Sequence, residues 1–173
     1  LFGEFTARVS RALEPGTEVM LKGPFGRFCA TAPERPELVL LAGGIGITPF
    51  LSLLRHLSDV PPANQRVVLL WANNRRDDAF LLPELEGHLR SLDLRIVHVI
   101  ANGQGLEAAR AGSGCFWEAG LLTAEALRRH IGELTRPSVY LCGSEPMQDY
   151  VLGQLASLGI DSQQVEKEAF KRR

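Results

Sequence analysis

The stretch LVLLAGGIGITPFLSLLRHL, residues 38–57, decides how this chain folds. An apolar run leads into three glycines, and Thr48 and Pro49 then open a pattern of apolar residues at helical spacing. Glycines directly after a buried strand let the backbone approach a pyrophosphate, and the free N–H groups at the start of the next helix attract an anion. Thr48 is expected to cap that helix, with Pro49 at its first position. The sequence therefore predicts an anion-binding turn, formed by Gly43, Gly44 and Gly46.

Two common phosphate-binding patterns do not fit this turn. A phosphate loop of the ATPase type has Lys followed by Ser or Thr after its glycines, and no such pair follows here. The dinucleotide fingerprint G-x-G-x-x-G has its third glycine where this chain has Pro49. A tight strand-to-helix turn that binds no ligand therefore stays open as the alternative.

Apolar segments alternate with helical patterns along the rest of the chain. Strands are expected at residues 38–42, 66–72, 94–100 and 138–142, and helices at residues 49–57, 82–91, 124–133 and 146–158. Residues 101–122 are rich in glycine and have no clear period, so a long loop is expected there. Continuous apolar strands between helices predict an α/β fold with a doubly wound parallel sheet, which binds ligands at the carboxyl ends of its strands.

The first residues have a different pattern. Residues 2–28 contain short alternating segments separated by Pro and Gly turns, which is typical of antiparallel β structure. They are too few to close a barrel, so we expect an N-terminal stub of a β-barrel at residues 1–33 and the α/β domain at residues 34–173. The chain begins at Leu1 rather than Met, and we expect it to be a piece of a longer protein.

Composition favours a small-molecule ligand. The 173 residues include 19 Lys plus Arg against 20 Asp plus Glu, and without a long block of one sign neither nucleic acid nor an anionic membrane is indicated as a partner. Three cysteines share no metal-ligand spacing, which predicts no metal site and a reducing compartment such as the cytoplasm. No apolar run approaches the roughly 20 residues of a membrane helix.

The ends of two further strands carry candidate binding residues. Asn74, Arg75 and Arg76 follow the second strand, where an Arg can accommodate the 2′-phosphate of NADPH. The alternative is that both arginines are solvated loop charges. Cys142 and Gly143 end the last predicted strand, which places a thiol beside the ligand crevice. A buried, inert cysteine is the alternative there.

Five segments in order resemble the ferredoxin–NADP⁺ reductase superfamily, and the ferric reductase and NADPH oxidase branch looks nearest. These segments are GPFGRF (23–28), AGGIGITPF (42–50), NNRRDDAFLLPELE (73–86), YLCGSEPM (140–147) and EAF (168–170). The resemblance covers nearly the whole chain and draws its specificity from the order and spacing of the segments. It departs from the family pattern at residues 144–146, where Ser-Glu-Pro replaces the usual Pro, and at residues 171–173, which extend past the final aromatic.

The resemblance implies a role for each of these segments. It implies that the glycine turn holds the pyrophosphate with Thr48 and Pro49 near the nicotinamide, and that residues 74–76 meet the adenosine end. It further implies that the YLCGSEPM segment packs by the nicotinamide, and that the final EAF segment reaches the flavin. The residues carried over from these two segments are Cys142, Gly143, Met147, Glu168 and Phe170. Cys142 and Glu168 are expected to support hydride transfer rather than to act as nucleophiles.

The family's flavin-binding element, Arg-x-Tyr-Ser/Thr, does not occur before residue 23. We therefore expect the pyridine-nucleotide domain of a flavoprotein oxidoreductase, which binds NADP(H) or NAD(H) here and FAD elsewhere in the parent chain. Hydride would pass from NAD(P)H to FAD, and electrons to an acceptor such as ferric iron, haem or an iron–sulfur protein. Whether a membrane-embedded domain precedes it stays open. The alternative function is a non-catalytic nucleotide-binding module that regulates a partner subunit.

Overall fold

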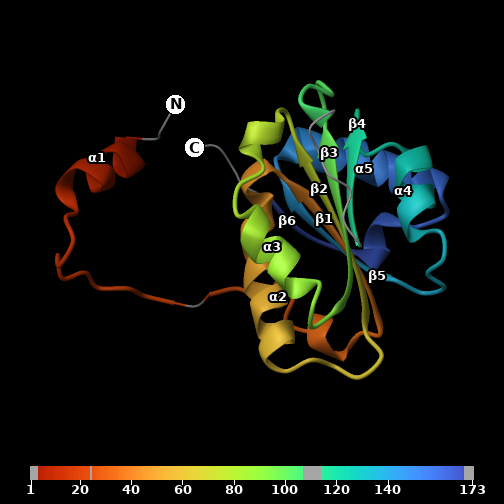
Figure 1. Cartoon of the computed structure of the whole chain (residues 1–173), viewed down its shortest axis with the longest axis horizontal. Coiled ribbons are helices and arrows are strands. Elements are labelled where there is room, and N and C mark those ends of the chain that lie inside the picture. The colour runs from red at the N-terminus through yellow and green to blue at the C-terminus, as the bar shows by residue number, and fades with distance from the viewer. Residues whose placement is uncertain (1–3, 24, 107–113, 170–173) are drawn as a thin grey trace.

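A six-stranded sheet, parallel throughout, forms the centre of the molecule (Figure 1). The computed structural model describes residues 4–23, 25–106 and 114–169. In spatial order the strands are β4 (Cys115–Ala119), β3 (Asp93–Ile100), β2 (Arg66–Asn73), β1 (Glu37–Gly43), β5 (Ser138–Gly143) and β6 (Val165–Ala169). The strand order runs outward in both directions from β1, which confirms the doubly wound parallel sheet predicted from the sequence.

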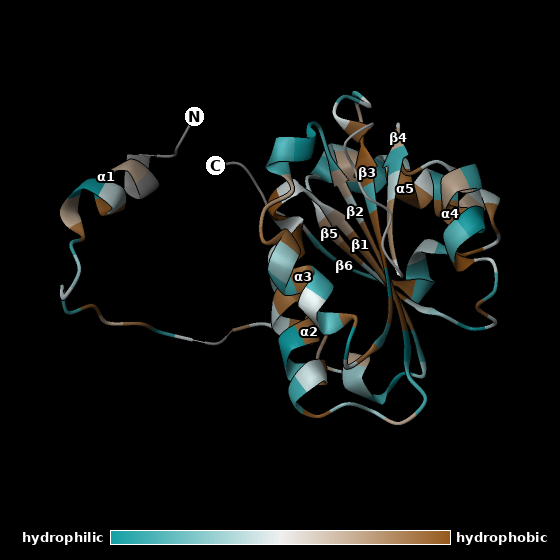
Figure 2. Ribbon diagram, in the orientation of Figure 1, coloured by the Kyte–Doolittle hydropathy of each residue, from teal (hydrophilic) through white to brown (hydrophobic). Residues whose placement is uncertain are grey.

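Two pairs of helices cover the two faces of this sheet. One pair is α2 (Thr48–Asp59) with α3 (Leu82–His88), and the other is α4 (Ala124–Ile131) with α5 (Glu145–Ser157). Alternate residues of β1 point to opposite faces: Leu40 belongs to the buried cluster with α2 and α3, and Leu41 to the cluster with α4 and α5. Figure 2 shows apolar colouring along the central strands and mixed apolar and polar colouring on the helices that cover them. The four predicted helices and four predicted strands all form, with ends that either coincide with the prediction or shift by up to three residues.

Two strands were not predicted. β4 lies within residues 101–122, where a long loop was expected, and that prediction was wrong for residues 115–119. β6 has the sequence VEKEA, whose charges hide the strand pattern. Both strands lie at edges of the sheet, where short length and charged residues are common because one side of the backbone has no partner strand.

The N-terminal segment differs from the prediction. The structure has a helix, α1 (Glu4–Ala12), where strands of a barrel stub were expected, and no strand occurs within residues 4–23 or 25–33. A strand needs a neighbour for its backbone hydrogen bonds, and in Figure 1 α1 lies away from the sheet, so only a helix satisfies this backbone locally. The predicted boundary between residues 33 and 34 stays a prediction.

The chain joins the sheet domain just before β1. Cys29 and Ala32 are buried in the cluster with α2 and α3. Gln65, also buried, donates from Nε2 to the carbonyl oxygens of Ala32 (3.1 Å) and Arg35 (2.7 Å). These contacts fix the entry to β1. Among the residues described, no helix combines the length and apolar character needed to cross a bilayer.

Candidate functional site

One row of register partners crosses all six strands near their carboxyl ends. From one edge to the other it consists of Trp117, His98, Trp71, Ala42, Cys142 and Glu168. Partners in parallel strands point to the same face, and this is the face that α2 and α3 cover. The carboxyl ends of parallel strands are where ligands of doubly wound folds bind. The two predicted hydride-transfer residues, Cys142 and Glu168, are direct neighbours in this row.

The glycine turn after β1 is a 3₁₀ turn, η2 (Gly44–Ile47), held from two sides. On the β2 side, Trp71 Nε1 donates to the carbonyl oxygen of Gly44 at 2.8 Å. On the β5 side, a Cβ at Gly46 would lie 2.1 Å from the carbonyl oxygen of Cys142, so only glycine fits there. Gly44 has a left-handed backbone (φ +52°), and the space where its Cβ would point is open. The turn is therefore fixed in place with an open face at Gly44.

Met147 and Gln148 close the β5 side of the site. A Cβ added to Gly43 or Gly143 would lie 2.9 or 2.7 Å from Met147 Sδ, so the thioether packs directly on both glycines. Gln148, which is buried, donates from Nε2 to the carbonyl oxygens of Gly143 (3.1 Å) and Glu168 (2.6 Å). These bonds tie the end of β5 to β6 and so set the position of Glu168 relative to Cys142.

Thr48 does not cap α2 as predicted. It has helical backbone angles (φ −59°, ψ −44°) and is the first residue of α2, with Pro49 second. Its hydroxyl donates to the carbonyl oxygen of Ile45 at 3.1 Å instead of accepting from the helix. The reason is η2: because this 3₁₀ turn runs directly into α2, Thr48 already lies inside helical backbone. Its side chain is exposed beside the turn.

Cys142 is enclosed at the carboxyl end of β5, with no exposed surface. Burial, and to a smaller extent the carboxylate of Glu168, raise the pKa of the Cys142 thiol to about 11. The thiol is therefore protonated at neutral pH, and a protonated thiol is a poor nucleophile. Glu168 itself is exposed. Phe170, the predicted flavin-side aromatic, lies outside the described residues.

The residues after β2 lie toward the β4 edge, on the other side of the turn from Cys142. Arg76 stacks its guanidinium over the ring of Trp117, with 5.3 Å from Cζ to the ring centroid. Arg75 is exposed and approaches Asp77 (3.5 Å), and Asn74 is exposed. Asn73 is buried, and within the described part of the chain neither polar atom of its side chain has a hydrogen-bond partner. A buried amide without partners is costly, and no group in the described residues offsets that cost.

Two other features of the molecule are less suited to ligand chemistry. A hollow of about 770 Å³ opens at the amino ends of the strands, away from the edge where such folds bind ligands. Glu37 on its wall already accepts hydrogen bonds from the backbone N–H groups of Thr135 (3.0 Å) and Arg136 (2.9 Å). This carboxylate serves to fix a loop.

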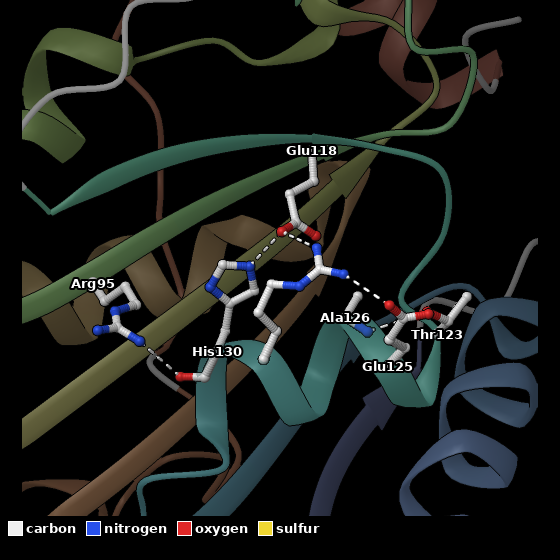
Figure 3. Close-up of polar contacts among 7 residues, drawn as sticks. Arg95, Glu118, Thr123, Glu125, Ala126 and His130 are labelled. Carbon is white, nitrogen blue, oxygen red and sulfur yellow. Dashed lines mark hydrogen bonds and ion pairs between the residues drawn. The ribbon is translucent and has the colours of Figure 1, made fainter.

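The second feature is a polar cluster that joins β4 to α4 (Figure 3). Glu118 Oε1 accepts from Arg129 Nη1 at 2.7 Å and from His130 Nε2 at 2.8 Å. Arg95 donates to the carbonyl oxygen of His130 at 3.2 Å. Because these side chains are hydrogen-bonded to one another or to the backbone, the cluster attaches the helix to the edge strand.

The residues of the site therefore match a pyridine nucleotide. The open face of Gly44 and the helix start behind it suit a pyrophosphate, Arg75 and Arg76 flank one end, and Cys142 lies at the other. Sequence reasoning missed Trp71, Trp117 and Gln148 as parts of this site. A tryptophan inside an apolar strand, as in RVVLLWA, was the available signal, because a buried indole N–H needs an acceptor.

Comparisons with known proteins also indicate a nucleotide-binding domain of an oxidoreductase. The family profile described as oxidoreductase NAD-binding domain matches residues 40–152. The chain is 29% identical, over 168 residues, to the reductase component of propane 2-monooxygenase from Mycolicibacterium goodii, covering 97% of this chain and 47% of that protein. It is 26% identical to NADH-cytochrome b5 reductase 2 of Mycosarcoma maydis, covering 90% of this chain and 47% of that protein. The chain thus spans about half the length of these relatives.

Solved structures share the fold. The cytochrome b5 reductase domain of Ulva prolifera nitrate reductase superposes with a TM-score of 0.71 at 24% identity, over 96% of this chain and 64% of that one. A cytochrome P450 reductase of Amycolatopsis gives a TM-score of 0.67 at 18% identity, over 87% of this chain and 43% of that one. These relatives do not single out the ferric reductase and NADPH oxidase branch.

Proposed function

The chain belongs to the oxidoreductase NAD-binding domain family of the ferredoxin–NADP⁺ reductase superfamily, and from this we propose that it binds NADH or NADPH for a flavoprotein reductase. The observation that carries the proposal is the glycine turn, which is fixed between β2 and β5 and open at Gly44. Such a turn presents backbone N–H groups to a pyrophosphate without the cost of ordering a loop on binding.

The chain's own residues have distinct tasks in this proposal. When bound, a reduced nicotinamide supplies the hydride, and FAD in the rest of the protein is the proposed acceptor. Cys142, which has no exposed surface, supports the nicotinamide end from beneath, Met147 packs on Gly43 and Gly143 beside it, and the segment that contains Glu168 and Phe170 is assigned to the flavin side. The final electron acceptor, whether ferric iron, haem or an iron–sulfur protein, lies beyond this chain. The three free, buried thiols favour a reducing compartment such as the cytoplasm.

Binding at the turn can be tested with a charge at Gly44. Asn and Asp both tolerate left-handed backbone, so Gly44→Asn and Gly44→Asp should fold alike while only Asp places a negative charge against the pyrophosphate. We expect calorimetric titration to show NADP⁺ or NAD⁺ binding by wild type, weaker binding by Gly44→Asn, and roughly tenfold further loss in Gly44→Asp. Gly159→Asp is the control, since Gly159 also has left-handed backbone (φ +82°) and open space, beyond the end of α5. Equal affinity in all four proteins would exclude the turn as the binding site.

We propose that Arg75 and Arg76 favour NADPH over NADH. A guanidinium can make two parallel charge-assisted hydrogen bonds to a 2′-phosphate. Replacing both with Ala should weaken NADP⁺ by roughly 2–4 kcal/mol, after a discount for solvent screening, and leave NAD⁺ nearly unchanged. The single variants separate exposed Arg75 from Arg76, which is stacked on Trp117. Equal losses for the two nucleotides would show that these arginines do not read the 2′-phosphate.

A further inference from the structure

We propose that Trp71 is a positioning residue whose indole N–H fixes the glycine turn in its nucleotide-binding conformation. The proposal rests on the function proposed above, because it assigns a task to a residue behind the same site. Trp71 has no exposed surface, so it acts through the backbone of the turn rather than by touching a ligand from solvent.

The first argument is the hydrogen bond itself. Trp71 Nε1, the only donor of the indole side chain, lies 2.8 Å from the carbonyl oxygen of Gly44. Gly44 is the residue with left-handed backbone, the conformation that would be lost first if the turn relaxed. The second half of the turn is held locally, since the N–H and hydroxyl of Thr48 both donate to the carbonyl oxygen of Ile45. Trp71 thus holds the first half, which contains the open face.

The second argument is that the indole is itself held firmly. The ring of Phe80 meets Trp71 edge-on at 5.4 Å between centroids, and the ring of His98, on the neighbouring β3, packs against it at 5.8 Å. His98 in turn stacks on Trp117 at 4.2 Å. Neither ring nitrogen of His98 has a hydrogen-bond partner in the described residues, so the indole N–H bonds to the carbonyl oxygen of Gly44 and not to the neighbouring imidazole. The indole N–H therefore points at the turn.

The third argument separates positioning from packing. Any large apolar side chain at residue 71 could fill the space between β2, α2 and α3. The N–H adds nothing to that packing, and burying it is favourable only because the turn supplies an acceptor. Arg76 stacks on the ring of Trp117, and the neighbouring side chains of His98 and Trp71 connect that ring to the turn. The arginine end of the proposed nucleotide site and the glycine turn at its centre are thus built on one set of packed rings.

The experiment removes the N–H and keeps the shape. Replacing Trp71 with 3-(3-benzothienyl)alanine, in which sulfur takes the place of the N–H, should leave the melting temperature nearly unchanged. Hydrogen exchange at the amides of residues 45–48 should accelerate about 2- to 10-fold, the range expected for one neutral hydrogen bond, while the amides of β1 and β2 keep their wild-type rates. The dissociation constants for NAD⁺ and NADP⁺ should rise by the same factor, because the pyrophosphate is common to both. Trp71→Phe should show the same pattern together with some loss of stability.

Tyr140→Phe is the matched control. It also removes one hydrogen bond from a buried aromatic side chain of the same core, because Tyr140 Oη contacts Thr31 Oγ1 at 3.3 Å. It should leave exchange in the turn and nucleotide affinity unchanged. If hydrogen exchange in the turn is unchanged after removal of the Trp71 N–H, the proposal is overturned. It is also overturned if removal of this N–H lowers stability and changes nothing else. If wild type binds neither nucleotide, the proposed function fails, while the exchange rates still decide whether Trp71 holds the turn.

Discussion

Cys142 packs in the core, and we propose that it also aligns the nicotinamide end of the site. Cys142→Ala in the flavin-containing whole protein should slow flavin reduction on the order of 100-fold while nucleotide affinity stays nearly constant. The reason is that a shift of the nicotinamide by about 1 Å disturbs its alignment with the flavin more than it weakens binding. The loss of the sulfur should cost about 1 kcal/mol of stability. Stopped-flow reduction by NADPH and a melting curve measure the two effects.

Cys115→Ala is the control for that experiment. Cys115 is equally buried, at 2% exposed, but lies on β4, at the opposite edge of the sheet from β6. The Cys115→Ala variant should lose about as much stability as Cys142→Ala, but its flavin should be reduced at the wild-type rate. If Cys142→Ala and Cys115→Ala change stability and the rate of flavin reduction alike, Cys142 contributes only to packing of the core.

His98 makes stability depend on pH. Burial lowers the pKa of His98 from 6.5 to about 4. Below pH 6.5, His98 is protonated in the unfolded chain but stays neutral in the folded chain. The free energy of unfolding therefore falls as pH drops from 6.5 toward 4. Between about pH 7.5 and about pH 5, wild type should lose about 2 kcal/mol more than His98→Phe, which keeps a ring in the stack. Urea unfolding at the two pH values measures this, and equal losses would mean that His98 is not buried in its neutral form.

At the residue scale, the sequence predicted a glycine turn after the first strand but not the reason for each glycine. At residue 46 the structure supplies that reason in the carbonyl oxygen of Cys142, whereas the predicted contact with a pyrophosphate stays a prediction. Thr48 was assigned the wrong role because a 3₁₀ turn before a helix leaves no pattern of its own in residue types. The stack of Arg76 on Trp117 depends on β4, which brings distant residues together and was not predicted.

At the scale of elements, the attachment of α4 to β4 depends on Glu118. Burial alone would raise the pKa of this carboxyl, but the hydrogen bonds from His130 and Arg129 outweigh it and lower the pKa. Glu118→Gln should destabilise the protein by about 1–2 kcal/mol near neutral pH, after a discount for its partial exposure. Because the folded pKa is lowered, this stabilisation is present above the ordinary pKa of Glu and is lost as pH falls through the lowered value. Thermal unfolding across the acidic range measures the difference between the two proteins.

Glu125→Gln is the comparison variant, since Glu125 pairs with the same Arg129 at 3.1 Å but its side chain is 82% exposed. It should change stability little. An effect as large as that of Glu118→Gln would contradict the view that the partly buried carboxylate holds the helix.

The central strands and the four covering helices could be predicted because burial on both faces imposes long apolar runs and helical periods. The edge strands could not. β6 reads VEKEA, and its strand character comes from pairing with β5 rather than from its own residues. The same cause explains α1: the alternation in EFTARVS resembled a strand, but no described strand lies beside it, and a helix formed instead.

At the scale of the whole molecule, the segment between α1 and the sheet domain has the most exposed apolar side chains. Met20 is 97% exposed, Leu21 91% and Phe25 76%. Trypsin should therefore cut after Lys22 and Arg27 before any site within the described residues of the sheet domain, and leave a product that begins near residue 28. Mass spectrometry of a time course checks this order. Earlier cleavage after Arg55 or Arg66 would show that the sheet domain opens more readily than this segment.

The row of residues that crosses the sheet has a practical consequence. The chain has two tryptophans, Trp71 and Trp117, and both belong to that row. The emission of tryptophan overlaps the absorption band of a reduced nicotinamide, so a bound reduced nucleotide would receive excitation energy from the protein. Oxidised nucleotide lacks that band and would not. The intrinsic fluorescence of the unlabelled protein would thus distinguish the redox state of its ligand, which makes the row a built-in optical probe of the proposed reaction.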